Sequence, residues 1–176
     1  MKKTQLVTIV SCLLAAGGAD AAVVRQIKVD GLQRVERETV LSYVNVKSGD
    51  DVSSQDLNSA FKKLYTTGLF SDVSFDIKGD VLTIKVDENP IINKRFFDGN
   101  DKVDDKMLET EVQLGPRSIY TPAKVQEDVQ RILTVYKRVG RYAATVEPKV
   151  IKRDQNRVDL IFEIDEGPLA KITKIN

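Results

Sequence analysis

The segment DGNDKVDDKMLE, which runs from Asp98 to Glu109, is the part of the sequence that most resembles a metal site. Oxygen-bearing residues stand at positions 1, 3, 7 and 12 of a possible calcium loop: Asp98, Asn100, Asp104 and Glu109. Two other positions argue against calcium, because Lys102 occupies a ligand position and Val103 stands where the sharp turn needs glycine. We therefore interpret the segment as a turn followed by the charged start of a helix, and we expect no metal there.

The residues available for catalysis are few. Histidine is absent, and the single cysteine, Cys12, lies near the N-terminus. This excludes His-based triads and argues against cysteine nucleophiles and sites with His or Cys ligands. Neighbouring carboxylates occur at Asp50-Asp51, Asp87-Glu88 and Asp165-Glu166. Adjacent residues of a strand point to opposite faces, so such pairs do not converge on a substrate. We expect no enzyme activity and no cofactor.

The first 21 residues have the layout of a secretory signal peptide. Met1-Lys2-Lys3 is a short basic start, Leu6 to Ala16 is an apolar stretch too short to span a bilayer, and Ala19-Asp20-Ala21 fits a small-x-small cleavage site. Ile9 to Cys12 resembles a lipoprotein cleavage box, but apolar residues continue beyond the cysteine. We therefore expect Cys12 to be part of the leader and cleavage to follow residue 21.

Removal of residues 1–21 leaves a chain of balanced charge. It takes away two lysines and one aspartate, so 25 basic and 25 acidic residues remain. No excess of positive charge is left to bind nucleic acid. KH-type RNA-binding domains need a Gly-x-x-Gly loop, whereas Gly49-Asp50-Asp51-Val52 is acidic and has no second glycine. The remaining chain has no cysteine, so we expect it to fold without disulfides.

The sequence contains an internal repeat. DVLTIKVDENP (Asp80–Pro90) and RVDLIFEIDEGP (Arg157–Pro168) are alternating apolar runs that end in Asp-Glu, one further residue and proline. Upstream, LYTTGLFSDV (Leu64–Val73) corresponds to VYKRVGRYAATV (Val135–Val146), and VRQIKVDGLQRV corresponds to INKRFFDGNDKV. Three anchors recur in the same order, which predicts two tandem copies of one unit of roughly 70–80 residues.

Each copy has the periodicity of a β-α-α-β-β unit. The first copy is expected to contain a strand over Val23–Val29, a helix over Glu36–Asn45, a helix from the capping box Ser53-x-x-Asp56 to Gly68, and a hairpin of strands over Val73–Ile77 and Leu82–Val86. The second helix should bury Leu57, Ala60, Phe61, Leu64 and Tyr65. In the second copy, Thr121-Pro122 starts a helix that ends at Gly140, and Val158–Ile164 is the last strand.

The predicted fold class is α+β: two tandem β-α-α-β-β domains, each a three-stranded sheet covered by two helices on one face. The expected organisation is a signal peptide over 1–21, a first domain over 22–90 and a second domain over 91–168. KITKIN follows Pro168 as INKRF follows Pro90, so residues 169–176 are expected to begin a third, truncated repeat.

This pattern resembles the POTRA domain family. The resemblance rests on the leader, on IKVDGLQRV (Ile27–Val35), LYTTGLFSDV and the strand ending in DENP, and on their recurrence in the second copy. It covers essentially the whole chain after the leader. One departure is Arg95, which stands where the first copy has the apolar Ile27, so the register of that strand is open.

The resemblance implies the periplasmic region of an outer-membrane β-barrel assembly factor. Its implied partners are unfolded outer-membrane protein precursors and accessory lipoproteins of an assembly complex, with no nucleic acid, and it would meet the membrane only through a barrel outside these residues. Two alternatives remain within the fold: the periplasmic part of a two-partner secretion transporter, and a free-standing periplasmic scaffold. The repeats could also serve as spacers.

The resemblance further implies that the last strand of each unit is central and the second strand forms an edge. An exposed edge offers unpaired backbone groups to an extended partner chain, which is β-augmentation. We therefore predict docking edges over Ser71–Ile77 and Tyr142–Val150, the second shortened by Pro148. The expected partner-binding residues are Ser71, Asp72, Val73, Ser74, Phe75, Asp76, Ile77, Tyr142, Ala144, Thr145 and Val146.

Overall fold

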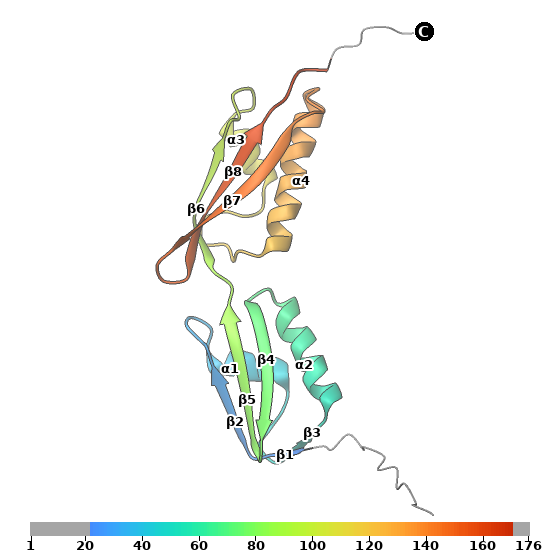
Figure 1. The fold of residues 1–176 in the computed structure, drawn as a ribbon, viewed down its shortest axis with the longest axis vertical. Helices are drawn as coiled ribbons and strands as arrows, with labels where there is room; N and C mark the ends of the chain where they lie inside the picture. The colour runs from blue at the N-terminus through green and yellow to red at the C-terminus, as the bar shows by residue number, and fades with distance from the viewer. Residues whose placement is uncertain (1–21, 171–176) are drawn as a thin grey trace, which may run out of the picture.

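The computed structural model describes residues 22–170 and contains two three-stranded sheets, each with its own helices (Figure 1). The expected signal peptide and most of the expected third repeat lie outside the described residues. The first repeat contains β1 (Ala22–Val24), β2 (Gln26–Asp30), α1 (Arg37–Val44), β3 (Asp50–Val52), α2 (Ser54–Thr66), β4 (Phe70–Lys78) and β5 (Val81–Glu88). The second contains β6 (Ile91–Asp98), α3 (Asp105–Glu111), α4 (Pro122–Arg138), β7 (Thr145–Arg153) and β8 (Arg157–Asp165). None of the helices in residues 22–170 is long and apolar enough to span a membrane.

Both sheets have the same topology. The strand order is β2-β5-β4 in the first repeat and β6-β8-β7 in the second. In each sheet the last strand is central, pairing in parallel with the first strand and antiparallel with the second. This confirms the predicted α+β class and its two repeated units.

Each repeat has a separate hydrophobic core between its helices and one face of its sheet. In the first repeat, Val40 of α1 and Leu64 of α2 pack with Leu82 and Ile84 of the central strand, and all four side chains are fully buried. The corresponding core of the second repeat includes four fully buried side chains from α3, α4 and β8: Leu108, Ile132, Tyr136 and Phe162. The period-2 alternation along the central strands therefore predicted the buried face correctly.

The predicted helix ends are confirmed. Ser53 and Asp56 form a reciprocal capping box at the start of α2, so two backbone N–H groups at that terminus have side-chain acceptors. The Thr121 hydroxyl accepts a hydrogen bond from the Lys124 N–H at the start of α4. Gly68 and Gly140 follow α2 and α4 with φ of 69° and 79°, the left-handed conformation that favours glycine after a helix.

Three features of the first repeat differ from the prediction. The strand expected over Val23–Val29 is interrupted at Arg25: β1 pairs with β3, and β2 pairs with β5. The acidic loop at Gly49–Val52 contributes β3, which apolar periodicity could not indicate in a strand of three residues.

On α2, Phe61 and Tyr65 were expected in the core but are 38% and 57% exposed, because the buried positions of the helix are Ala60 and Leu64.

Arg95 marks an irregular strand, as its departure from the first copy suggested. The pairing of β6 with β8 shifts register between Ile92 and Lys94. The Arg95 side chain is 10% exposed and lies over the ring of Phe97, with 5.0 Å from the guanidinium carbon to the ring centroid. Its Nη1 donates to the Leu114 carbonyl at 2.9 Å, and Nη2 pairs with Glu109 at 3.2 Å. These partners allow a charged side chain at a largely buried position.

The repeated Asp-Glu ending has a structural role. Glu88 is 4% exposed, and its Oε1 accepts hydrogen bonds from the backbone N–H groups of Gln33, Arg34 and Val35 at 2.7, 2.8 and 2.9 Å. Its Oε2 lies 3.3 Å from Arg34 Nε. Burial acts to raise the pKa of Glu88, but the three N–H groups and Arg34 favour the charged form more strongly, and the pKa lies below its ordinary value of 4.5.

The second repeat has a related arrangement at Glu166. Its Oε1 accepts from the Lys102 N–H at 2.7 Å and from the Tyr136 hydroxyl at 3.1 Å. Burial and the charge of Glu166 raise the pKa of Tyr136, so this hydroxyl keeps the proton that it donates. In both repeats, the glutamate near the end of the last strand holds the loop that follows the first strand.

Replacing Glu88 by glutamine is expected to lower the free energy of unfolding by about 1–3 kcal/mol, because the N–H groups of Gln33, Arg34 and Val35 lose a charged acceptor. The pKa of Glu88 is lowered in the folded state, so its contribution is complete above pH 4.5 and is lost as the pH falls through the folded-state pKa. Urea unfolding between pH 3 and pH 7 should therefore show a weaker pH dependence for Glu88→Gln. Asp87→Asn, at the exposed neighbouring position, is the matched control. Equal stability of wild type and Glu88→Gln at pH 7 would contradict this role.

Candidate partner-binding edges

The candidate site consists of the two long edge strands, β4 and β7. Each is nine residues long and pairs with a neighbouring strand on one side only, β4 with β5 and β7 with β8. The opposite edges of the two sheets are less open. The edge strand β2 has five residues, and its Ile27 carbonyl accepts a hydrogen bond from Arg37 at 2.9 Å. At β6, Ile92 exchanges hydrogen bonds with Arg117 and Ser118.

On β4, one hydrogen bond indicates which amides face the open edge. The N–H of Val73 donates to the Asp72 carboxylate at 2.9 Å, so it is not available to β5. Backbone groups alternate sides along a strand, which places the N–H groups of Phe75 and Ile77 on the same open side. The pairing with β5 runs without a shift from Asp72 to Lys78, so the turn at Gly79-Asp80 sets the direction of these amides. An incoming strand would have to replace Asp72 as the acceptor at Val73.

A groove lies between β4 and α2. It is lined by Ser54, Leu57, Asn58, Phe61, Val73, Ser74 and Phe75. At its margin, the rings of Phe61 and Tyr65 stack with centroids 5.8 Å apart and planes 14° apart. The open edge of the first repeat is therefore bordered by exposed aromatic surface, which could contact side chains of an extended chain paired with β4.

The second predicted edge begins later than expected. Tyr142 and Ala144 precede β7, which starts at Thr145, and Tyr142 lies in a turn with 69% exposure. The turn after Gly140 shifts the start of the strand, which the alternating pattern alone did not locate. At its other end, β7 extends beyond Val150 to Arg153. Pro148 lies within β7 and has no backbone N–H to donate. Edge strands tolerate proline nonetheless.

The remaining site residues lie as the alternation predicts. Ser74 and Thr145 are exposed, Val73 and Val146 point into their cores, and Phe75 is partly buried. Ser71, Asp72, Asp76 and Ile77 also belong to β4. The structure thus brings Ser71–Ile77 together on one edge and places Thr145 and Val146 on the other.

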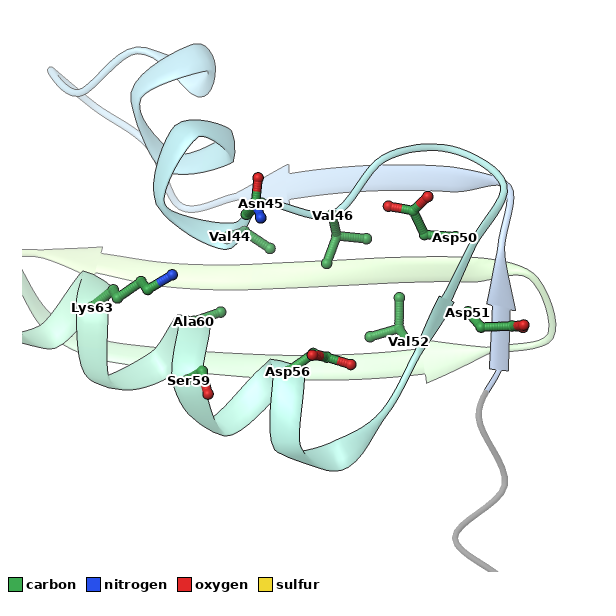
Figure 2. Close-up of a pocket in the computed structure, with 10 residues that line it drawn as sticks. All are labelled: Val44, Asn45, Val46, Asp50, Asp51, Val52, Asp56, Ser59, Ala60 and Lys63. Atoms are coloured by element: carbon green, nitrogen blue, oxygen red, sulfur yellow. The ribbon is translucent and has the colours of Figure 1, made fainter.

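The concave surface between α1, β3 and α2 is polar (Figure 2). Its carboxylates are Asp50, Asp51 and Asp56, and Lys63 lies further along α2 than Asp56. Asp56 is engaged in the capping box. In the segment Asp98–Glu109, Asp104 caps α3 and the Asn100 amide donates to the Val103 carbonyl. Residues 22–170 contain no group of three His, Cys, Asp or Glu side chains placed to hold a metal ion.

The repeated sheet topology agrees with a comparison against protein families. The family model for POTRA, described as a surface antigen variable number repeat, matches residues 22–89 and again residues 90–167. The chain belongs to the POTRA family. The resemblance inferred from the sequence is confirmed, and residues 22–167 are two POTRA repeats in tandem.

Curated relatives are outer-membrane protein assembly factors. The chain is 32% identical over 178 residues to the factor BamA of Neisseria meningitidis serogroup B, covering 97% of this chain and 22% of that protein. It is 26% identical to BamA of Neorickettsia risticii, covering 85% of this chain and 20% of the relative. The chain thus spans about a fifth of the length of these relatives.

Solved structures support the same fold. The N-terminal domain of Omp85 from Thermosynechococcus elongatus matches with a TM-score of 0.60 at 18% identity, covering 83% of this chain and 63% of that one. A two-repeat POTRA fragment of Omp85 from Anabaena matches with a TM-score of 0.53 at 18% identity, covering 85% of this chain and 98% of that fragment.

If Phe61 belongs to a binding surface rather than the core, its removal should cost little stability. We expect Phe61→Ala to lower the free energy of unfolding by about 1.5 kcal/mol or less, the range of an aromatic pair. Leu64→Ala, three residues along the same helix and fully buried, should cost about 2–5 kcal/mol. Urea denaturation of both variants checks this, and equal losses would place Phe61 in the core.

Proposed function

We propose that these POTRA repeats form the periplasmic part of an outer-membrane β-barrel assembly factor and bind unfolded outer-membrane protein precursors by β-augmentation. The observation that carries the proposal is the pair of nine-residue edge strands, β4 and β7, each paired on one side only. Backbone hydrogen bonds place little demand on sequence, so one edge can accept many different strands. The curated relatives, named as outer-membrane protein assembly factors, support this choice among POTRA functions.

Accessory lipoproteins of the same assembly complex are proposed as a second group of partners. The two sheets provide two separate edges, so a client and an accessory protein could bind at the same time. The edge of the first repeat is the stronger candidate for clients. Pro148 interrupts the row of backbone N–H donors along β7, whereas β4 contains no proline. Insertion into the membrane is assigned to a barrel outside these residues.

We also propose that the repeats act as two domains, residues 22–90 and 91–168, because each has its own hydrophobic core. The leader would export them to the periplasm. The mature chain is then expected to begin at Ala22, and intact mass of the periplasmic product measures this directly. A product that begins with a lipid-modified Cys12 would contradict both the cleavage site and the free N-terminus.

Client binding is tested by titrating a peptide from an outer-membrane barrel strand into the isotope-labelled chain. Amide shifts should concentrate on β4, and the N–H groups of Phe75 and Ile77 should become protected from hydrogen exchange. Phe75→Pro should abolish these shifts, because it removes an edge donor, whereas Phe75→Leu keeps the donor and should retain binding. Dispersed amide signals from α2 and β5 should show that the first repeat of the Phe75→Pro variant is still folded.

Two results would reject edge binding. One is the absence of shifts at about 1 mM peptide, which corresponds to a binding free energy weaker than about −4 kcal/mol. The other is a set of shifts confined to α2 around Asn58–Lys63, which would assign binding to the helix.

A further inference from the structure

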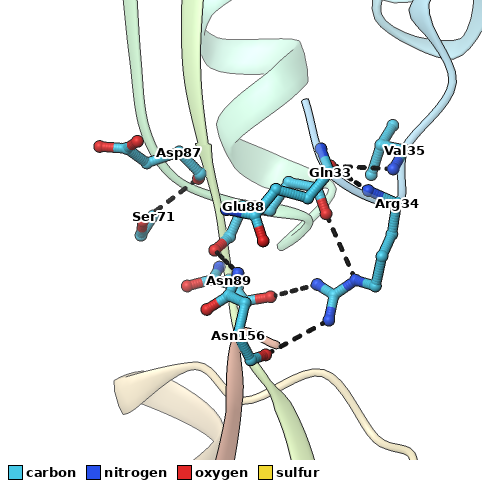
Figure 3. A network of polar contacts seen from close by, with 8 residues as sticks. All are labelled: Gln33, Arg34, Val35, Ser71, Asp87, Glu88, Asn89 and Asn156. Carbon is cyan, nitrogen blue, oxygen red and sulfur yellow. Dashed lines mark hydrogen bonds and ion pairs between the residues drawn. The ribbon is translucent and has the colours of Figure 1, made fainter. Parts of the chain in front are cut away.

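The contacts between the two repeats centre on Arg34, in the loop between β2 and α1 (Figure 3). Its Nε lies 3.3 Å from Glu88 Oε2, inside the first repeat. Its Nη2 donates to the carbonyl of Asn89, in the connector, at 2.7 Å. Its Nη1 donates to the carbonyl of Asn156, in the second repeat, at 3.4 Å. One planar guanidinium therefore bonds to both repeats and to the chain that joins them.

Asn156 supplies the matching contacts from the second repeat. It lies in the turn between β7 and β8 with a φ of 50°. Its side-chain amide donates to the Glu88 carbonyl at 2.8 Å, and its carbonyl accepts from the Ile91 N–H at 3.1 Å. The contact with Glu88 fastens the tip of the β7–β8 hairpin to the end of β5, as Figure 3 shows.

Apolar packing does not fix this joint. The buried apolar residues of the described chain form two clusters, one in each repeat, with no residue in common. Only Asn89 and Pro90 separate β5 from β6. Beside the hairpin tip lies a cavity of about 340 Å³, lined by residues of both repeats, among them Ser71, Asp87 and Arg157. The orientation of the repeats thus depends on a few polar contacts next to open space.

We propose that Arg34 and Asn156 form a latch that holds the two POTRA repeats in one orientation and opens without unfolding either of them. The latch fixes how β4 and β7 are presented to any partner that contacts both repeats. When it opens, Glu88 keeps its three backbone donors, and the β7–β8 ladder keeps its pairing from Thr145 to Arg153. Each repeat therefore retains its internal contacts.

The second repeat shows that the latch arginine is not needed for the fold of a repeat. Lys102 occupies the position that corresponds to Arg34, and its backbone N–H donates to Glu166 as the Arg34 N–H donates to Glu88. Arg34→Lys should therefore keep the loop and a positive charge near Glu88. It loses the planar fork that reaches Asn89 and Asn156.

The test variant combines Arg34→Lys with Asn156→Gly. Glycine accepts the positive φ of Asn156, so the turn should be retained while the amide donor is lost. Gln155→Gly is the matched control, because Gln155 is the neighbouring turn residue with a φ of 59° and its side chain accepts only from Arg157 of the same repeat.

The orientation is measured by electron–electron distance between spin labels at Lys62→Cys on α2 and Gln130→Cys on α4, in a Cys12→Ser background. Both sites are exposed, and Cys12 is the only native cysteine. The distance distribution should be single and narrow in the labelled chain without latch substitutions, and also in the Gln155→Gly variant. It should be broad in the double variant. Amide spectra should show both repeats folded in every variant.

Three results would overturn the latch. They are a broad distribution without the latch substitutions, a narrow and unshifted distribution in the double variant, and unfolding of either repeat in the double variant.

Discussion

A glutamate carboxylate that accepts hydrogen bonds from the loop after the first strand is the interaction on which each repeat depends. Glu88 holds the loop at Gln33–Val35, and Glu166 holds the corresponding loop at Lys102. These loops carry the chain from the first strand to the first helix, so the carboxylate fixes how the helices approach the sheet. Glu88 itself is removed from water, so it needs these donors to stay charged.

The same loops explain why glycine recurs beside them. A Cβ on Gly31 would lie 1.9 Å from the Val86 carbonyl oxygen, and one on Gly99 would lie 2.1 Å from that of Ile164. The loop backbone therefore passes directly over the last strand, where no side chain fits. Asp-Gly at the end of the first strand and Asp-Glu at the end of the last strand thus both belong to the region where the loop meets the last strand, in each repeat. The central position of that last strand then leaves β4 and β7 at the edges.

Local patterns predicted those parts of the fold that local physics determines. The alternation in β5 and β8, the capping box at Ser53 and the helix ends at Gly68 and Gly140 all depend on residues close in sequence. The misplaced features depend on distant contacts. Phe61 and Tyr65 have the right spacing for a core face, but the small Ala60 lets α2 lie against the sheet with them at the margin. The β1–β3 pair joins segments about thirty residues apart. Which N–H groups of β4 face the open edge depends on its pairing with β5, which the alternation of side chains does not specify.

The parallel pairing of first and last strands has a mechanical consequence. Tension applied along the chain reaches each three-stranded sheet through its first strand, β2 or β6, and leaves through its last, β5 or β8. Because β2 is parallel to β5, and β6 to β8, pulling slides the two strands past each other instead of peeling them apart. All hydrogen bonds of the pair then bear the force together, and rupture is governed by the rate of unfolding. The pairing covers five residue pairs in the first repeat and seven in the second, so the first repeat should yield at the lower force.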